Sequence, residues 1–155
     1  MHIDSQVDIT PRETAANSID REELIAALRE LLAAERAGAR TAAACLAQAH
    51  NATLQAQLNQ LQRQEVSSCR ALLHCLQHLD AKPGQAVGDF YQKVMALDTF
   101  QERMELIDAG QRWVLRRVER LLPRVHDSII AHHLETVRHY HAPGSKAASS
   151  GSKEP

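Results

Sequence analysis

The chain has 155 residues and a mass of 17.2 kDa, which is enough for one compact domain and too little for two. Its net charge is -1 with histidines neutral, so it lacks the basic excess that drives binding to nucleic acid or to an anionic membrane surface. Only 3% of residues are aromatic, whereas 24 are Ala and 18 are Leu, a composition that favours helices over strands. No apolar run is long enough to span a membrane.

Two features of the sequence predict a cytoplasmic location. The first ten residues lack the basic-then-apolar pattern of a secretion signal. Cys45, Cys69 and Cys75 are odd in number and have no Cys-x-x-Cys spacing, which indicates reduced thiols.

The two ends of the chain differ in composition from its middle. Residues 1–18 are predicted to be a loose leader. Residues 143–155 are rich in Gly, Ser and Lys and are predicted to be a disordered tail. Residues 19–142 are therefore expected to form the folded domain.

Four long segments of this domain repeat apolar residues at spacings of three and four, the pattern of amphipathic helices. The first segment begins with a capping box of Asp20 and Glu23, the second with Thr53 as N-cap, and the third ends at Pro123. A shorter helix is predicted between the second and third segments. The helices are expected at residues 20–49, 54–79, 85–97, 98–122 and 126–141.

Two of the connections between the long helices are short. The simplest arrangement is an all-α, up-down-up-down four-helix bundle, with residues 80–97 crossing one end.

One carboxylate interrupts the apolar stripe of each of the first two helices. Glu35 precedes His50 by the same number of positions as Glu65 follows it. At about 1.5 Å per residue, both lie about 22 Å from the connecting turn. Antiparallel neighbours meet at equal distances from their turn, so the two carboxylates are expected to face each other.

The same comparison applies to the third and fourth helices, which turn around Arg124. Asp108 precedes Arg124 by almost the same number of positions as His141 follows it. Gln111 occupies the same seam as Asp108, one turn along. If both turns lie at one end of the bundle, each helix contributes one polar residue at a common level.

Carboxylates and imidazole clustered inside a helical bundle are the ligands that iron or manganese uses. The predicted metal ligands are Glu35, Glu65, Asp108 and His141. Gly38 and Gly110 lie near the same level. A glycine inside a helix is unfavourable by about 1 kcal/mol relative to Ala, so each glycine is expected to admit a neighbouring group.

Other interpretations of these residues stay open at this point. A shared proton or an arginine would also neutralise a buried carboxylate pair, and Asp108 can face solvent. His141 can lie in a frayed last turn, and Cys69 can be a small core thiol. His74 and His78 have the i, i+4 spacing of a zinc or iron pair but also suit a solvated face. The candidate arginines are Arg40, Arg103 and Arg112.

Several segments carry a family resemblance. The Glu-bearing helices resemble the ferritin-like superfamily. A group of small bacterial ferritin-like proteins of unestablished function is similar in AERAGA (34–39), GDFYQKVMAL (88–97), ERMELIDAGQRWVLRRV (102–118) and LPR (122–124). The resemblance implies Glu35 and Glu65 as metal positions. The chain departs from the Glu-x-x-His motifs of metal-binding members, because Ser68 and Arg138 stand where His would follow Glu65 and Glu135.

The resulting hypothesis is a small cytoplasmic ferritin-like bundle with an interior carboxylate site for iron or manganese, used in redox chemistry or metal handling. The alternative is a non-enzymatic helical interaction protein that has lost the metal site. A homodimer is also predicted, because the first helix carries a broad face of small residues that suits close helix approach. That face consists of Ala33, Ala34, Ala37, Ala43, Ala44 and Ala47.

Overall fold

The structure is a computed structural model that describes residues 18–143. The predicted leader up to residue 17 and the predicted tail from residue 144 lie outside this range. All regular structure among the described residues is helical, which confirms the all-α prediction, and none of these helices is long and apolar enough to cross a membrane. The elements are α2 (Arg21–Gln48), α3 (Ala52–His78), α4 (Phe90–Met95), α5 (Phe100–Leu121), the 3-10 turn η1 (Leu122–Arg124) and α6 (Ser128–His141).

Each of the four longer helices begins at a polar side chain that accepts a hydrogen bond from a free backbone N–H. The predicted cap Asp20 accepts from the Glu23 amide at 2.8 Å. The prediction of Thr53 for α3 was wrong, because Asn51 accepts from the Leu54 amide at 2.9 Å and starts the helix earlier. Such caps satisfy N–H groups that have no partner within the helix.

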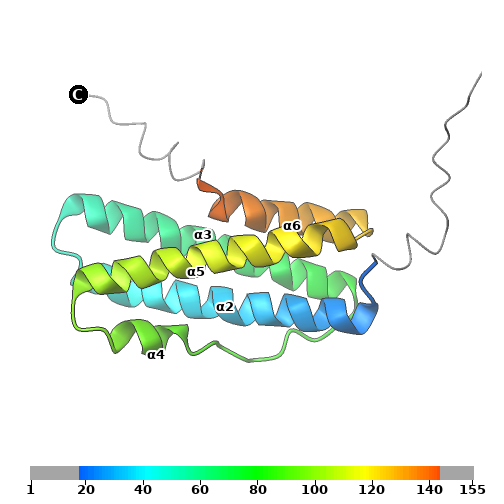
Figure 1. Cartoon of the computed structure of the whole chain (residues 1–155), viewed down its shortest axis with the longest axis horizontal. Helices are drawn as coiled ribbons and strands as arrows, with labels where there is room; N and C mark the ends of the chain where they lie inside the picture. Colours follow the sequence, from blue (N-terminus) through cyan, green and yellow to red (C-terminus); the bar gives the residue numbers. More distant parts are fainter. Residues whose placement is uncertain (1–17, 144–155) are drawn as a thin grey trace, which may run out of the picture.

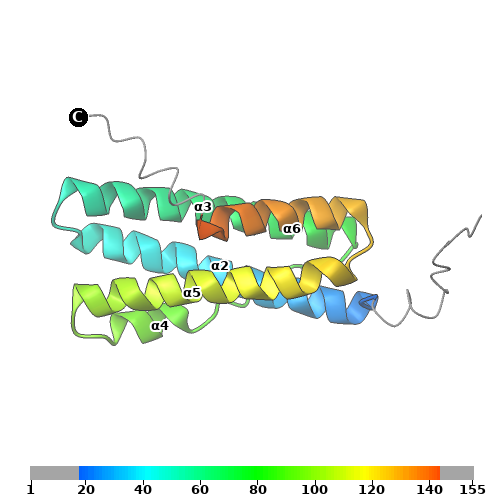
Figure 2. The ribbon, with the colours of Figure 1, turned by 45° about the horizontal axis from the view of Figure 1, so that its top comes forward.

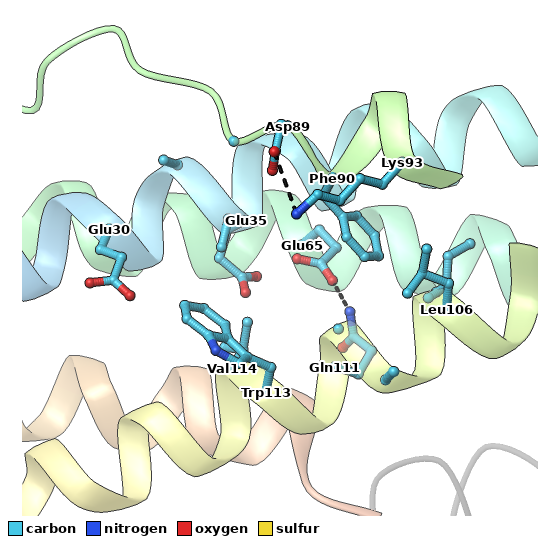
Figure 3. Close-up of a pocket in the computed structure, with 17 residues that line it drawn as sticks. Glu30, Glu35, Glu65, Asp89, Phe90, Lys93, Leu106, Gln111, Trp113 and Val114 are labelled. Atoms are coloured by element: carbon cyan, nitrogen blue, oxygen red, sulfur yellow. Dashed lines mark hydrogen bonds and ion pairs between the residues drawn. The ribbon is translucent and has the colours of Figure 1, made fainter. Parts of the chain in front are cut away.

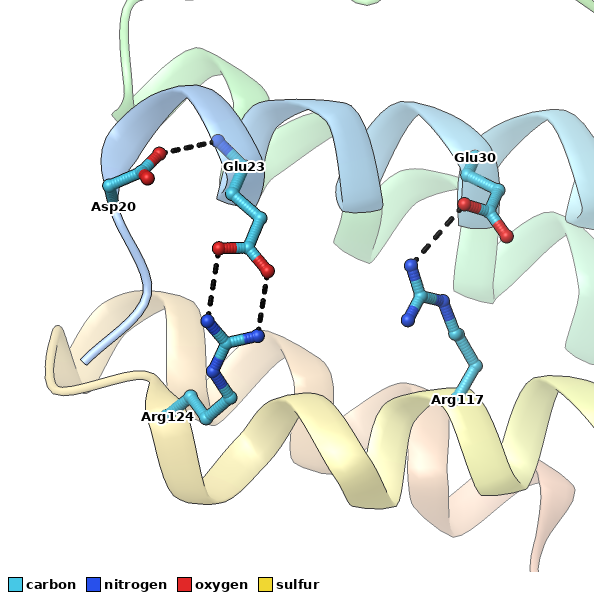
Figure 4. Close-up of polar contacts among 5 residues, drawn as sticks. All are labelled: Asp20, Glu23, Glu30, Arg117 and Arg124. Carbon is cyan, nitrogen blue, oxygen red and sulfur yellow. Dashed lines mark hydrogen bonds and ion pairs between the residues drawn. The ribbon is translucent and has the colours of Figure 1, made fainter. Parts of the chain in front are cut away.

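The four longer helices lie side by side, and α2 and α6 run in one direction while α3 and α5 run in the other (Figures 1 and 2). The predicted up-down-up-down order was therefore wrong. The turn between α5 and α6 lies where α2 begins, since the Ile19 amide donates to the Arg124 carbonyl at 3.0 Å. At the same place Arg124 binds both carboxylate oxygens of Glu23, at 2.7 and 3.0 Å (Figure 4).

The long connection between α3 and α5 explains this order. It runs along α2 and returns the chain to the end where α3 began, instead of crossing one end as predicted (Figure 1). Three arginines of α2 hold it by donating to its backbone carbonyls: Arg21 to Leu79 at 2.6 Å, Arg29 to Lys82 at 2.9 Å, and Arg36 to Gly84 and Ala86 at 3.0 and 3.2 Å.

The last part of the connection packs closely between α2 and α5. The Gly88 amide donates to the Ala33 carbonyl at 3.1 Å. On the other side, a Cβ atom at Gly110 would lie 2.9 Å from Cζ of Phe90, so this glycine admits a neighbouring ring as expected. Ala37 is fully buried, and Gly88 packs against it, so the connection covers part of the alanine face that suggested self-association.

Two apolar clusters fill the interior, and polar residues separate them. The larger cluster includes Leu28, Leu72 and Leu134 and lies where α6 packs against the other helices. The smaller cluster consists of Cys45, Leu58, Val94 and Ile107. Because α6 has only 14 residues, it ends beside the middle of α3 (Figure 2). This end of α6 brings its last side chain to the boundary between the clusters.

Candidate metal centre

Four buried polar side chains, one from each longer helix, meet at the boundary between the two apolar clusters. They are Glu35 on α2, Glu65 on α3, Gln111 on α5 and His141 on α6, exposed by 0%, 2%, 7% and 3%. On each of the first three of these helices, the polar residue lies between residues of the two clusters. Residues of one cluster come before it in the helix, and residues of the other cluster come after it. The polar residues that interrupt the separate apolar stripes therefore form one shared polar layer.

Three of these side chains offer ligand atoms to a common point. One atom each from Glu35, Glu65 and His141 lies within 4.8 Å of the others. The Nε2 atom of His141 is 3.1 Å from Oε1 of Glu35 and 3.8 Å from Oε1 of Glu65. The structure thus brings together three of the four predicted ligands.

The last turn of α6 orients the imidazole of His141. Its Nδ1 atom lies 2.8 Å from the carbonyl oxygen of Val137. A carbonyl oxygen only accepts hydrogen bonds, so Nδ1 carries the hydrogen in this contact. With the hydrogen on Nδ1, Nε2 is the ring atom that faces the two carboxylates and could bind a metal beside them.

Several polar atoms of this layer have no hydrogen-bond partner among the described residues. They are both carboxylate oxygens of Glu35, Oε2 of Glu65, Nε2 of His141 and Oγ of Ser68. The Gln111 amide donates to Oε1 of Glu65 and holds that carboxylate from α5 (Figure 3). An unsatisfied buried polar group is unfavourable by about 1–3 kcal/mol, so this layer favours an added proton or cation.

Burial also changes the acidity of both carboxyl groups. Removal from water raises the pKa of Glu35 from 4.5 to about 7, and the neighbouring Glu65 and Ser68 offset part of this rise. The pKa of Glu65 is raised well above 4.5, first by burial and then by the charge of Glu35, while His141 and Gln111 act in the opposite direction. Two ionised carboxylates without a compensating charge are therefore disfavoured here.

The arginines considered as alternative neutralising groups are engaged elsewhere or exposed. Arg40 lies 3.9 Å above the ring of Tyr91, and Arg103 donates to the Leu97 carbonyl at 3.0 Å. Arg112 is exposed. Within the part of the chain that the structure describes, only His141 lies within ion-pair distance of Glu35 or Glu65.

Asp108 is exposed and does not join the ligand group. The buried face of α5 runs through Ile107, Gln111, Val114 and Val118. Asp108 follows Ile107 by one position, which turns it about 100° around the helix and away from that face. Gln111, noted in the sequence as the next residue of the seam, is the α5 residue that reaches Glu65.

The other candidate ligands lie outside the centre. His74 stacks on His133 of α6 with ring centroids 5.3 Å apart, and Nε2 of His78 pairs at 2.8 Å with Asp127, the N-cap of α6. Burial raises the pKa of Cys69 to about 12, with further contributions from Glu35 and Glu65. Cys69 is not among the residues whose ligand atoms gather at the centre.

A cavity of about 530 Å³ adjoins the two carboxylates on the side of α4 and α5 (Figure 3). The connection that packs along α2 supplies part of its wall, including Gly88 and Phe90. The cavity was not predicted from the sequence, because the connection was expected to cross one end of the bundle. Gly88 lies inside a segment that was expected to be helical, and this glycine was the one sign in the sequence that the segment packs closely against another helix.

A model of one protein family matches residues 22–149, which include all four residues of the polar layer. The chain belongs to the DUF6306 family. DUF6306 is described as a domain of unknown function, so membership assigns no activity to the centre. No curated protein and no solved structure matches the chain.

Proposed function

We propose that this DUF6306 protein is a ferritin-like four-helix bundle that binds one iron(II) or manganese(II) ion through Glu35, Glu65 and His141. The single observation that carries the proposal is the buried group of three ligand atoms within 4.8 Å of one another. Each ligand comes from a different helix, so the folded chain preorganises the set. A bound divalent cation would neutralise both carboxylates and give the unpartnered oxygens and Nε2 a partner.

The donor chemistry supports iron(II) or manganese(II). Carboxylate oxygen and imidazole nitrogen suit both ions, and the ligand group contains no thiol, the ligand that softer metals prefer. Three protein ligands leave further coordination positions open. A metal with open coordination positions suits redox chemistry or metal handling. Which of the two it performs depends on the molecule that binds at those positions.

The chain path supports the ferritin-like assignment. Ferritin-like bundles join two antiparallel helix pairs by one long connection, and here that connection runs along α2 between α3 and α5 (Figure 1). A two-metal ferritin-like site uses more carboxylates and two histidines. The chain has Ser68 where the first of these histidines would follow Glu65, so we propose one ion rather than two.

A second function rests on the contact between His141 and Glu35. Their 3.1 Å separation allows a shared proton or an ion pair to neutralise Glu35 without metal. The protein would then be a helical interaction protein, with the polar layer left as a structural feature.

Calorimetric titration of EDTA-treated, untagged protein with Mn(II) separates the two functions. The metal proposal predicts one bound ion per chain, lost in Glu35→Gln, Glu65→Gln and His141→Gln. Glu30→Gln serves as the control, because this exposed glutamate on α2 pairs with Arg117 outside the ligand group (Figure 4). Absence of Mn(II) and Fe(II) binding to the wild type would support the interaction protein.

A further inference from the structure

The cavity beside the centre runs from the surface toward the buried polar layer that contains Glu35 and Glu65. Glu35, Glu65 and Gln111 lie along its inner part (Figure 3). The outer part is lined by exposed residues, namely Glu30, Asp89, Lys93 and Trp113. His141 does not line the cavity, so its imidazole approaches the carboxylates from α6 on another side. A molecule in the cavity would therefore approach the centre from the side of Glu35 and Glu65 and not from the side of His141.

Small residues create this space between packed helices. Gly38, Gly88 and Gly110 lie in the wall together with Ala33, Ala34 and Ala109. Voids inside proteins are seldom much larger than a water molecule, whereas small-molecule sites measure about 300–1,000 Å³. The volume of this cavity, about 530 Å³, lies in the range of small-molecule sites.

The lining describes the shape of a suitable ligand. Phe90, Leu106, Ile107 and Val114 give the cavity apolar walls, and the polar groups lie at its inner end and at its rim. The rim charges are balanced, because Asp89 pairs with Lys93 and Glu30 pairs with Arg117, each at 3.4 Å. The rim thus selects neither charge, and the walls favour an apolar body of ring size.

We infer that the cavity binds a small organic molecule with an apolar, ring-sized body and one oxygen-donor end that coordinates the metal held by Glu35, Glu65 and His141. This inference rests on the proposed function, because an anionic oxygen at the inner end would otherwise face two carboxyl groups. The metal supplies the attraction for the polar end, and the walls between α2, α4 and α5 supply the contact for the ring.

Three simple probes separate these contributions in the full-length protein. Benzoate has both the ring and the oxygen donors, acetate lacks the ring, and benzylamine lacks the oxygen donors. Trp113 lines the cavity and is the only tryptophan of the sequence, so its fluorescence reports binding there. We expect benzoate to bind the Mn(II)-loaded protein about tenfold more tightly than it binds the EDTA-treated protein, with a change in Trp113 emission. Acetate and benzylamine should each bind the loaded protein about tenfold more weakly than benzoate.

Cavity-filling variants locate the probe. Ala109→Leu places extra volume in the wall, whereas Ala26→Leu makes the same change at an exposed position of α2. Ala109→Leu should weaken benzoate binding about fivefold and leave Mn(II) affinity unchanged, and Ala26→Leu should change neither. Leu106→Phe fills the same space and replaces Ala109→Leu if that variant does not fold.

The outcomes distinguish this inference from the proposed function. If Mn(II) binds with the expected ligand dependence but benzoate produces neither heat nor a change in Trp113 emission, the cavity inference is overturned and the metal proposal stands. Benzylamine binding as tightly as benzoate would also overturn it. If Mn(II) and Fe(II) do not bind at all, the proposed function fails, and the inference fails with it.

Discussion

Gly38 on α2 lies directly against the carboxyl group of Glu65 on α3. A Cβ atom at residue 38 would be 3.0 Å from both Cδ and Oε2 of Glu65. The other oxygen of Glu65 is held by Gln111, so the carboxylate has little freedom to move away. The absent side chain on α2 therefore makes room for a proposed metal ligand on α3.

This contact predicts that Gly38→Ala separates metal binding from folding. Alanine is the better helix former, and the group it displaces is the end of a side chain, so the variant should fold. Its Mn(II) affinity should fall about tenfold, because the displaced carboxylate is a proposed ligand. Gly88→Ala is the matched control, since its Cβ atom would lie 3.6 Å from the nearest atom. Calorimetry showing equal Mn(II) affinity in Gly38→Ala and wild type would contradict this role of Gly38.

The second prediction concerns the pH dependence of metal affinity. Burial raises the pKa of Glu35 to about 7 and that of Glu65 well above 4.5, so protons compete with the metal near neutral pH. Mn(II) affinity should rise between about pH 6 and pH 8, and binding should release protons. Titrations in buffers of different ionisation enthalpy measure that release. Affinity independent of pH over this range would contradict protonation of these carboxyl groups near neutral pH in the metal-free protein.

The metal-free protein should show the opposite trend in stability. At low pH the Glu35 carboxyl is protonated in the folded and the unfolded chain, so folding does not bury a charge at this residue. As the pH rises from about 4.5 through about 7, the unfolded chain loses this proton first, and folding stability decreases. Thermal unfolding in EDTA should therefore give a lower Tm at about pH 8 than at about pH 6. Glu35→Gln should reduce that difference, and an unchanged pH dependence in this variant would contradict the assignment.

Arg36 is predicted to hold the connection between α3 and α5 against α2. Its guanidinium donates to the carbonyls of Gly84 and Ala86, in a segment whose side chains from 82 to 87 are all exposed. Arg36→Ala should speed amide hydrogen exchange at Gly88, which donates to Ala33, while the interior of α3 exchanges as in wild type. Arg116→Ala, an exposed arginine of α5, is the control. Equal exchange at Gly88 in both variants would show that Arg36 does not hold the connection.

Much of the helical structure and half of the polar layer could be predicted from local patterns. Asp20 caps α2 because the residue type and the spacing to Glu23 are local properties. Glu35 and Glu65 meet because each lies near the middle of its helix, at equal distances from their shared turn. Counts of residues along two directly connected helices are sufficient for such a pair.

The direction of the later helices could not be predicted in this way. The count for His141 assumed that Arg124 and His50 lie at one end, whereas the Ile19 amide bonds to Arg124 at the opposite end. His141 still reaches Glu35, because Glu35 lies near the middle of the bundle and is almost equally far from its two ends. Asp108 faced outward for a different reason, since one step from Ile107 turns a side chain off the buried face of α5.

The stability of the protein with and without metal is the direct test of a metal centre at Glu35, Glu65 and His141. Unfolding is measured at about pH 7.5 in EDTA and in Mn(II) at about 100 times its dissociation constant, where binding adds about 2.7 kcal/mol to folding stability. The metal proposal predicts a Tm increase of about 5–10 °C for the wild type and for Glu30→Gln, and none for Glu35→Gln or Glu65→Gln. A wild type that melts at the same temperature in EDTA, Mn(II) and Fe(II) would contradict the claim that Glu35, Glu65 and His141 form a metal centre.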